Sequence, residues 1–214
     1  MNTLLLHPAA RPLVFLLSLA PFLWLSLLAA TDGLGANPQE ALIRSSGDWA
    51  LRFVCIALAV TPLRVMTRLH ALARWRRMLG LFAFFYASVH GLSYAVFDMG
   101  LDLAEILADI VKRPFILVGS LTFVVLLALA ATSFNRAVRW LGAVRWQRLH
   151  RLVYVAALTM LLHFSGCARA RAISPKCFFM QPWLQSCWAG GYGAGLACGR
   201  PTERSGFAGS EQAL

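Results

Sequence analysis

The sequence predicts an all-α fold, a polytopic bundle of transmembrane helices, and three observations support this prediction. Of the 214 residues, 59% are hydrophobic and 14% are charged, whereas soluble domains carry about a quarter charged residues. The mean hydropathy is +0.65. Apolar runs of about 20 residues recur along the chain, and a helix of that length spans the ~30 Å hydrocarbon core of a bilayer. We therefore expect a multi-span membrane protein.

Five clear spans are expected, each an apolar run bounded by charged or turn-forming residues. They cover residues 13–30, 48–66, 78–97, 114–133 and 149–164. The first run follows Arg11 and lacks a clean small-x-small cleavage pattern, so we interpret it as a retained helix and not as a signal peptide. Residues 31–47 contain Gly, Asn and Pro, which is typical of a loop.

Residues near the span boundaries fit this assignment. Trp49 and Arg52 stand near the start of the second span, where an aromatic belt and a snorkelling cation are expected. Pro114 opens the fourth span in the first-turn position that proline favours. A short surface helix is expected over residues 98–113, just before the fourth span, because four acids are spaced there among aliphatic residues: Asp98, Asp102, Glu105 and Asp109.

The placement of the positive charges predicts the orientation. The net charge of +11 is compatible with nucleic acid or anionic lipid as a partner. However, five Lys and Arg residues follow the second span and four follow the fourth, against one and two after the first and third. The positive-inside rule then makes the two arginine-rich loops and the N-terminus cytoplasmic. Membrane lipid is thus expected around the chain, and no nucleic acid.

Three histidines lie in the predicted spans: His90 in the third, and His150 and His163 in the fifth. The run 78–97 contains no Asp, Glu, Lys or Arg, so a ring nitrogen at that depth needs a partner. His150 and His163 are 13 residues apart, roughly 20 Å along a helix, and can serve two centres but not one. The two side chains are also about 220° apart around the helix axis, so both histidines can reach the same neighbouring helix only with a local bend or a long reach.

His90 and His163 are expected at the same depth, where they could supply two axial nitrogens to a planar macrocycle. Helix bundles hold b-type haem in this way. No C-x-x-C-H motif is present, which excludes c-type attachment. Zinc is disfavoured because no Cys or carboxylate joins the histidines at ligand spacing. The alternative is that these histidines only form hydrogen bonds between helices.

His150, expected near the cytoplasmic face, has no obvious partner in the sequence. Counting 13 residues back from His90 leads to Arg77, with Arg76 beside it. Arg77 could be an unusual ligand, a clamp for a haem propionate, or simply the end of a positive-inside loop. These alternatives remain open at the level of sequence.

Four segments, in this order and at this spacing, resemble the MsrQ (YedZ) family of the ferric-reductase-like transmembrane superfamily. They are SGDWALRF…LAVTPLR (46–64), RRMLGLFAFFYASVHGLSY (76–94), DIVKRPFILVG (109–119) and WQRLHRLVYVAALTMLLHF (146–164). The resemblance covers nearly all of residues 1–164. Members of this family are the haem-binding membrane subunits of the bacterial MsrPQ system.

The resemblance implies a protein of the bacterial inner membrane with one or two b haems, and FMN as a further cofactor. Such a subunit takes electrons from the quinone pool. It passes them to MsrP, a periplasmic molybdenum-cofactor reductase that repairs methionine sulfoxide in envelope proteins. The chain would therefore be an electron-transfer subunit and not the catalytic one. The family's haem ligands correspond to His90, His150 and His163, and its paired arginines to Arg76 and Arg77.

Two other functions remain possible at this stage. One is a cytochrome b that feeds another acceptor, such as ferric iron, although no C-terminal flavin or NADPH domain follows. The other is a transporter or scaffold whose histidines only pair helices. Residues 98–113 are either a docking face for a soluble partner or an ordinary solvated amphipathic segment.

The chain departs from the family pattern after Phe164, which predicts two parts. Residues 1–164 are expected to form the haem-binding transmembrane domain, and residues 165–214 a Cys- and Gly-rich tail with four of the five cysteines. The family continues there into a sixth span. Our first hypothesis is a frameshift that replaced the native ending. The second is a periplasmic tail with two disulfides, and the third is a weaker sixth span at 178–199.

Overall fold

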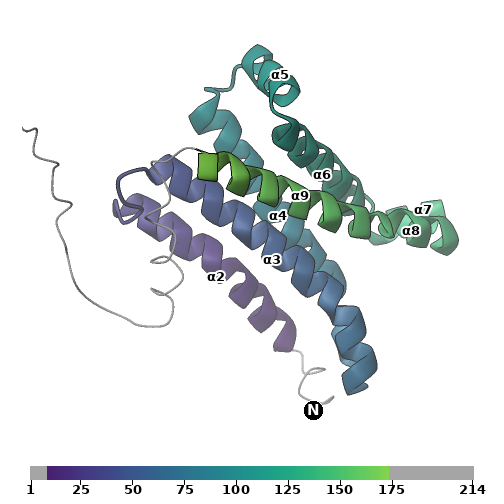
Figure 1. Ribbon diagram of the computed structural model, residues 1–214. Helices are drawn as coiled ribbons and strands as arrows, with labels where there is room; N and C mark the ends of the chain where they lie inside the picture. Colours follow the sequence, from purple (N-terminus) through teal and green to yellow (C-terminus); the bar gives the residue numbers. More distant parts are fainter. Residues whose placement is uncertain (1–8, 174–214) are drawn as a thin grey trace, which may run out of the picture. The chain divides into compact units, whose positions relative to one another are not determined.

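Helices provide all of the regular secondary structure in the computed structural model, which describes residues 9–173 (Figure 1). The long helices are α2 (Ala10–Ala30), α3 (Pro38–Thr67), α4 (Arg76–Ser93), α6 (Pro114–Ala131) and α9 (Leu152–Ile173). The short ones are the 3-10 helix η1 (His70–Arg74), the π-helical turn η2 (Tyr94–Asp98), α5 (Leu103–Lys112), α7 (Asn135–Leu141) and α8 (Ala143–His150). Within the described residues, 9–170 belong to one compact unit, which contains all of these helices except the end of α9.

Five helical segments in the described residues are long and apolar enough to cross a membrane, as the sequence predicted. They are Ala10–Ala30, Pro38–Thr67, Arg76–Asp98, Pro114–Ala131 and Ala143–Arg169. Large apolar side chains face outward from them; Leu17, Trp24 and Leu121 are each more than half exposed. Apolar surface on this scale indicates contact with lipid and not with water.

The loop predicted over residues 31–47 is only partly present. Residues 31–37 form the connection, but α3 already begins at Pro38, and Gly47 lies inside it. Pro38 occupies the first helical turn, where its missing N–H costs nothing, and Glu40 complements the helix dipole there. The loop prediction was wrong for residues 38–47 because proline and glycine were interpreted as helix breakers.

The predicted fifth span lies within one helical segment, Ala143–Arg169, that consists of two helices separated by a single residue with helical dihedral angles. α8 ends at His150 and α9 begins at Leu152, with Arg151 between them. α9 continues past Phe164 to Ile173, and Cys167 lies within it. The frameshift, the two disulfides and the sixth span at 178–199 concern a tail that lies almost entirely outside the described residues.

The predicted surface helix in 98–113 is confirmed as α5, and two of its four acids have structural roles. Asp102 accepts hydrogen bonds from the backbone N–H groups of Ala104 (2.8 Å) and Glu105 (3.3 Å), so it caps the helix. Asp109 is buried; it accepts a hydrogen bond from Tyr94 Oη (2.7 Å) and forms an ion pair with Arg113 (2.9 Å). These two acids are therefore less available to a docking partner than the sequence suggested.

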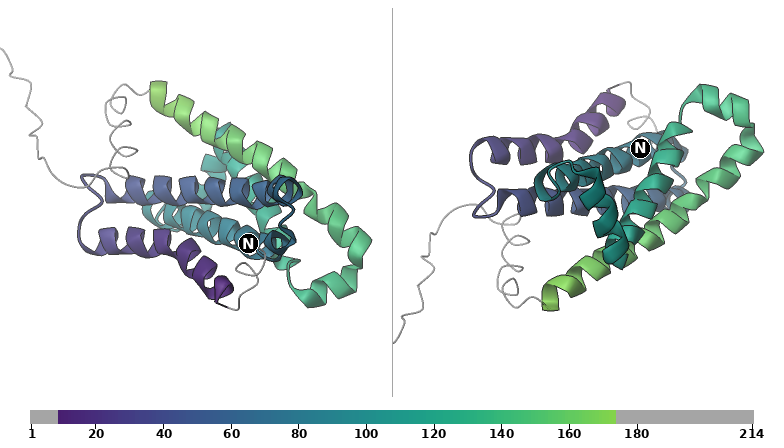
Figure 2. Two further views of the ribbon diagram at one scale, coloured as in Figure 1. Left: turned by 90° about the horizontal axis from the view of Figure 1, so that it is seen from below. Right: turned by 90° about the horizontal axis from the view of Figure 1, so that it is seen from above.

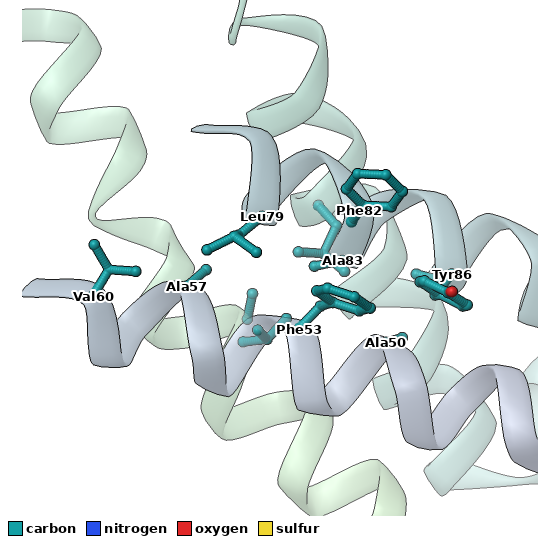
Figure 3. Close-up of a cluster of buried hydrophobic side chains, with 12 residues drawn as sticks. Ala50, Phe53, Ala57, Val60, Leu79, Phe82, Ala83 and Tyr86 are labelled. Carbon is teal, nitrogen blue, oxygen red and sulfur yellow. The ribbon is translucent and has the colours of Figure 1, made fainter. Parts of the chain in front are cut away.

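The buried core lies mainly between α3 and α4 (Figure 3). Phe53 of α3 stacks on Tyr86 of α4, with ring centroids 5.2 Å apart and planes 11° apart, and also on Phe82, 5.7 Å away. Alanines at positions 50 and 57 of α3 and 83 of α4 let the two backbones approach closely. Small residues and stacked aromatic rings hold this helix pair together, because lipid gives apolar side chains little reason to associate.

Tyr86 also joins α4 to a bend in α2, which is visible in both views of Figure 2. Pro21 lies inside α2, where its missing N–H and its ring disturb the helix. The Tyr86 hydroxyl donates to the Ser18 carbonyl (2.9 Å) and accepts from the Phe22 N–H (3.0 Å). Ser18 and Phe22 would bond each other in an unbroken helix, so one fully buried hydroxyl satisfies both ends of the opened bond.

Tyr86→Phe is expected to destabilise the bundle by about 2 kcal/mol, because it leaves a buried N–H and a buried carbonyl unpaired. The free energy of unfolding in detergent micelles measures this effect. Tyr154→Phe is the matched control, since the Tyr154 side chain is 59% exposed and its substitution should change stability by less than about 0.5 kcal/mol. Equal stability of the two variants would contradict the role given to the buried hydroxyl.

Candidate functional site

His90 of α4 and His163 of α9 face each other inside the bundle. Their ring centroids are 6.1 Å apart and their planes are inclined by 77°. The expectation that these two histidines lie at one level, on facing helices, is therefore confirmed. They belong to segments 73 positions apart in the chain, so the fold and not the local sequence creates the pair.

Each of these rings is held by a backbone carbonyl of another helix, α3 for His90 and α6 for His163. His90 Nδ1 lies 2.7 Å from the Ile43 carbonyl oxygen of α3, and His163 Nδ1 lies 2.6 Å from the Phe115 carbonyl oxygen of α6. A carbonyl only accepts, so Nδ1 carries the proton in both rings and Nε2 keeps its lone pair. This arrangement is the usual one for a metal-binding histidine, whose second nitrogen is held by a backbone oxygen.

Two glycines make room for these rings. Gly119 lies four residues after Phe115, and a Cβ at Gly119 would be 2.6 Å from His163 Nδ1. Gly47 lies four residues after Ile43, and a Cβ there would be 3.0 Å from His90 Nδ1. On each helix, the missing side chain exposes the carbonyl one turn earlier to the imidazole.

The sequence reasoning missed both glycines. Gly47 had been assigned to a loop, and Gly119 only formed part of a motif. The available signal was weak: a glycine inside an apolar helix costs helix stability, so it often marks a close approach of another group. Gly166 of α9 acts similarly, since a Cβ there would lie 2.7 Å from the Phe115 side chain.

The donor set suits a metal that brings most of its own ligands. Within residues 9–173, no group of three or more His, Cys, Asp or Glu side chains could hold a bare metal ion. A haem supplies four nitrogens to its iron and needs only one or two axial ligands from the protein. Two imidazoles on one metal have ring centres roughly 6 Å apart at ordinary metal–nitrogen distances, and the observed 6.1 Å agrees with this.

Cys167 also lies beside this pair, so the expectation that no Cys stands at ligand spacing from the histidines was wrong for this residue. It follows His163 by one helical turn, and its sulfur is 3.8 Å from His163 Nε2. This distance corresponds to a weak sulfur contact, so little hydrogen-bond energy would be lost if His163 Nε2 bound a metal instead.

His150 lies at the end of α8 and has different surroundings. Its ring stacks on Trp146, with centroids 3.9 Å apart, and its Nδ1 lies 3.2 Å from the Trp146 carbonyl oxygen. Trp146 Nε1 in turn donates to the Thr132 carbonyl (2.9 Å) at the end of α6. Arg76 and Arg77 are electrostatic neighbours of His150.

Arg77 is held by α7 and not by His150. Within the described part of the chain, its Nη1 donates to Asn135 Oδ1 at 2.7 Å. It also lines a pocket of about 330 Å³ together with residues from α4, α6 and the start of α7: Leu81, Ala130, Ser133, Phe134 and Asn135. The structure therefore brings Arg76, Arg77 and His150 to one end of the bundle, and their cofactor roles stay predictions.

Comparisons with known proteins agree with the architecture. The family model for the "Ferric reductase like transmembrane component" matches residues 46–161. The heme-binding subunit MsrQ of protein-methionine-sulfoxide reductase from Polaromonas naphthalenivorans is 66% identical over 160 residues, which cover 75% of this chain and 73% of the relative. The MsrQ subunit of Ralstonia nicotianae is 54% identical over 156 residues, covering 73% and 72%.

A relative of another kind shares the same region. The magnetosome protein MamZ of Magnetospirillum gryphiswaldense is 43% identical over 160 residues, which cover 72% of this chain but only 25% of MamZ. No solved structure matches this chain significantly.

Proposed function

The chain belongs to the MsrQ family of heme-binding subunits, within the ferric reductase like transmembrane family, and from this premise we propose that it is a b-haem electron-transfer subunit of a methionine sulfoxide reductase. It is a multi-pass membrane protein with five helical segments able to span a bilayer. The catalytic reduction of methionine sulfoxide takes place on a partner subunit in this proposal.

One observation carries the proposal. The imidazole rings of His90 and His163 have centroids 6.1 Å apart, and each ring bonds a backbone carbonyl through Nδ1, which leaves its Nε2 for iron. His90 and His163 would hold the iron of one haem. A haem, when bound, supplies one-electron chemistry that no protein side chain here provides. The carbonyls of Ile43 and Phe115 orient the rings, and the surrounding apolar helices exclude water.

A second haem fits the proposal at the opposite end of the bundle. His150 would provide an axial nitrogen there, and Arg76 and Arg77 would provide positive charge for its propionates or, in the case of Arg77, a second contact to the cofactor. Two centres at two levels suit a protein that must move electrons across ~30 Å of hydrocarbon. The proximity of both arginine charges to His150 supports this assignment.

The wider assignment follows the family resemblance. We propose that the chain lies in the bacterial inner membrane with its N-terminus in the cytoplasm, accepts electrons from the quinone pool and passes them to an MsrP-type periplasmic reductase. FMN is the further cofactor that the resemblance implies. Residues 1–164 belong to the haem-binding transmembrane domain in this proposal, and the tail proposed for 165–214 starts within α9, which continues to Ile173.

The test uses the full chain, expressed with ample haem and purified in detergent. We expect its haem absorbance to change from oxidised to reduced on addition of a short-chain quinol. It should return to oxidised when MsrP and methionine sulfoxide are added together, but not with either alone. Reoxidation by ferric iron and not by MsrP would favour the alternative cytochrome. A folded chain without haem would favour a transporter or scaffold with structural histidines.

A further inference from the structure

A second pocket lies at the arginine-bearing ends of two spans, and of its lining residues only Arg77 has a part in the function proposed above. It has a volume of about 300 Å³ and is lined by side chains from the start of α2, the end of η1 and the start of α4: Arg11, Arg74, Trp75, Arg77, Met78 and Leu81. Half of this lining is arginine, and no carboxylate takes part in it. Because α2 and α4 both begin here, the pocket lies where two membrane spans start.

The arginines of this pocket have no acidic partner in the described residues. The ion pairs found between residues 9 and 173 join Arg44 to Glu40 and Arg113 to Asp109, both on other helices. Arg77 donates one N–H group to the neutral amide of Asn135, and its other N–H groups can bind a further acceptor. Three guanidinium groups that converge without a counter-charge repel one another, so an anion among them is favourable.

Trp75 adds an independent observation. Its indole Nε1 is buried, and within the described residues it is the buried side-chain nitrogen that has no hydrogen-bond partner. A buried donor without an acceptor is unfavourable, and nearly all such groups in folded proteins are satisfied. The nitrogen is enclosed beneath the pocket lining, so Trp75 contributes an apolar ring surface to the pocket and not a donor.

We propose that this pocket binds the phosphate group of an anionic phospholipid. Guanidinium groups bind phosphate oxygens with two parallel hydrogen bonds, and three of them line this pocket. Met78 and Leu81 supply an apolar wall for the glycerol and the first part of the acyl chains. The ends of the membrane spans lie at the level of the lipid headgroups, where arginine and tryptophan are enriched. Arg77 is shared with the proposed second haem site, so the test uses Arg11 and Arg74, which have no part in that site.

The experiment compares lipids on the full-length chain. After delipidation in detergent, native mass spectrometry measures the binding of phosphatidylglycerol and of phosphatidylcholine. We expect preferential retention of phosphatidylglycerol. Arg11→Gln and Arg74→Gln should each weaken it about fivefold. Arg11→Lys keeps the charge but loses the paired hydrogen bonds, so it should weaken binding less than Arg11→Gln does.

Arg139→Gln is the matched control, because it removes one exposed positive charge from α7 without touching the pocket. It should leave phosphatidylglycerol retention unchanged, and circular dichroism must show that every variant keeps its helix content. Equal losses in Arg11→Gln, Arg74→Gln and Arg139→Gln would overturn the proposal, because they would mean diffuse attraction by surface charge. Complete displacement of the lipid by millimolar inorganic phosphate would overturn it too, and would identify a site for free phosphate.

Discussion

His163→Ala and His90→Ala are each expected to reduce haem occupancy more than tenfold at the site that the two histidines share. Removing one axial nitrogen leaves the iron with a single protein ligand, and a non-covalent b haem has no thioether bond to retain it. The remaining ring would still be held by its carbonyl, Ile43 for His90 or Phe115 for His163. The loss should therefore reflect ligation and not collapse of the bundle.

Pyridine haemochrome quantitation per mole of protein measures this loss. His150→Ala serves as the comparison, because it lies at the other end of the bundle and should spare the haem between His90 and His163. If both centres are filled in the parent, each single variant should retain about half of the haem, and the double variant His90→Ala with His150→Ala should retain almost none. Unchanged haem content in His90→Ala and His163→Ala would contradict the assignment of this pair.

Gly119→Ala is expected to have the next largest effect, although it adds a single methyl group. Its Cβ would lie 2.6 Å from His163 Nδ1 and 2.7 Å from Cε1, closer than real Cβ contacts allow. The imidazole must therefore move, and its 2.6 Å bond to the Phe115 carbonyl must lengthen or break. We expect haem affinity to fall about tenfold or more, as it does when a partner that orients a metal ligand is lost.

Gly80→Ala is the matched control for this substitution. Gly80 lies inside α4, and nothing lies within 4 Å of the position its Cβ would take. Alanine there should leave the haem spectrum unchanged and stabilise the helix by about 0.5–1 kcal/mol. The same comparison works on the other ring, where Gly47→Ala meets His90 Nδ1 at 3.0 Å and Gly91→Ala meets open space. Indistinguishable haem affinities within both pairs would contradict the role of the glycines.

The sequence was sufficient for those features that depend on hydropathy and on counting along a helix. Apolar runs predicted five spans, and counting residues from the span ends put His90 and His163 at one level. Both predictions agree with the structure. The 220° rotation between His150 and His163 indicated a bend or a long reach, and this stays a prediction, because Arg151 between α8 and α9 keeps helical dihedral angles.

Features that depend on the approach of distant backbone were not accessible in this way. Hydropathy describes contact with lipid, so it cannot identify the carbonyls of Ile43 and Phe115 that hold the two histidines. Nor can it show that Gly47 belongs to a helix, or that the Tyr86 hydroxyl accepts a hydrogen bond from the backbone of α2, 64 residues away. Each of these contacts forms only when two helices far apart in the sequence pack together.

Electrostatic roles were predicted less well than depth. The count of 13 residues led to Arg77 and left three roles open for it; its hydrogen bond in the structure goes to Asn135, and its cofactor roles stay predictions. The acids of 98–113 suggested a docking face, yet Asp102 caps α5 and Asp109 is buried. Charged side chains near helix ends have several local partners, and the sequence does not rank them.

The most direct test of the haem assignment is the electron paramagnetic resonance spectrum of the oxidised full-length chain, recorded beside its reduced-minus-oxidised visible spectrum. We predict a low-spin ferric signal of the kind that two imidazole ligands produce, together with a reduced α-band. Both should be lost from this centre in His90→Ala and His163→Ala, and Gly80→Ala should keep them. A folded parent protein without a Soret band, or a low-spin signal that persists unchanged in both histidine variants, would contradict the proposal that His90 and His163 hold a haem between them.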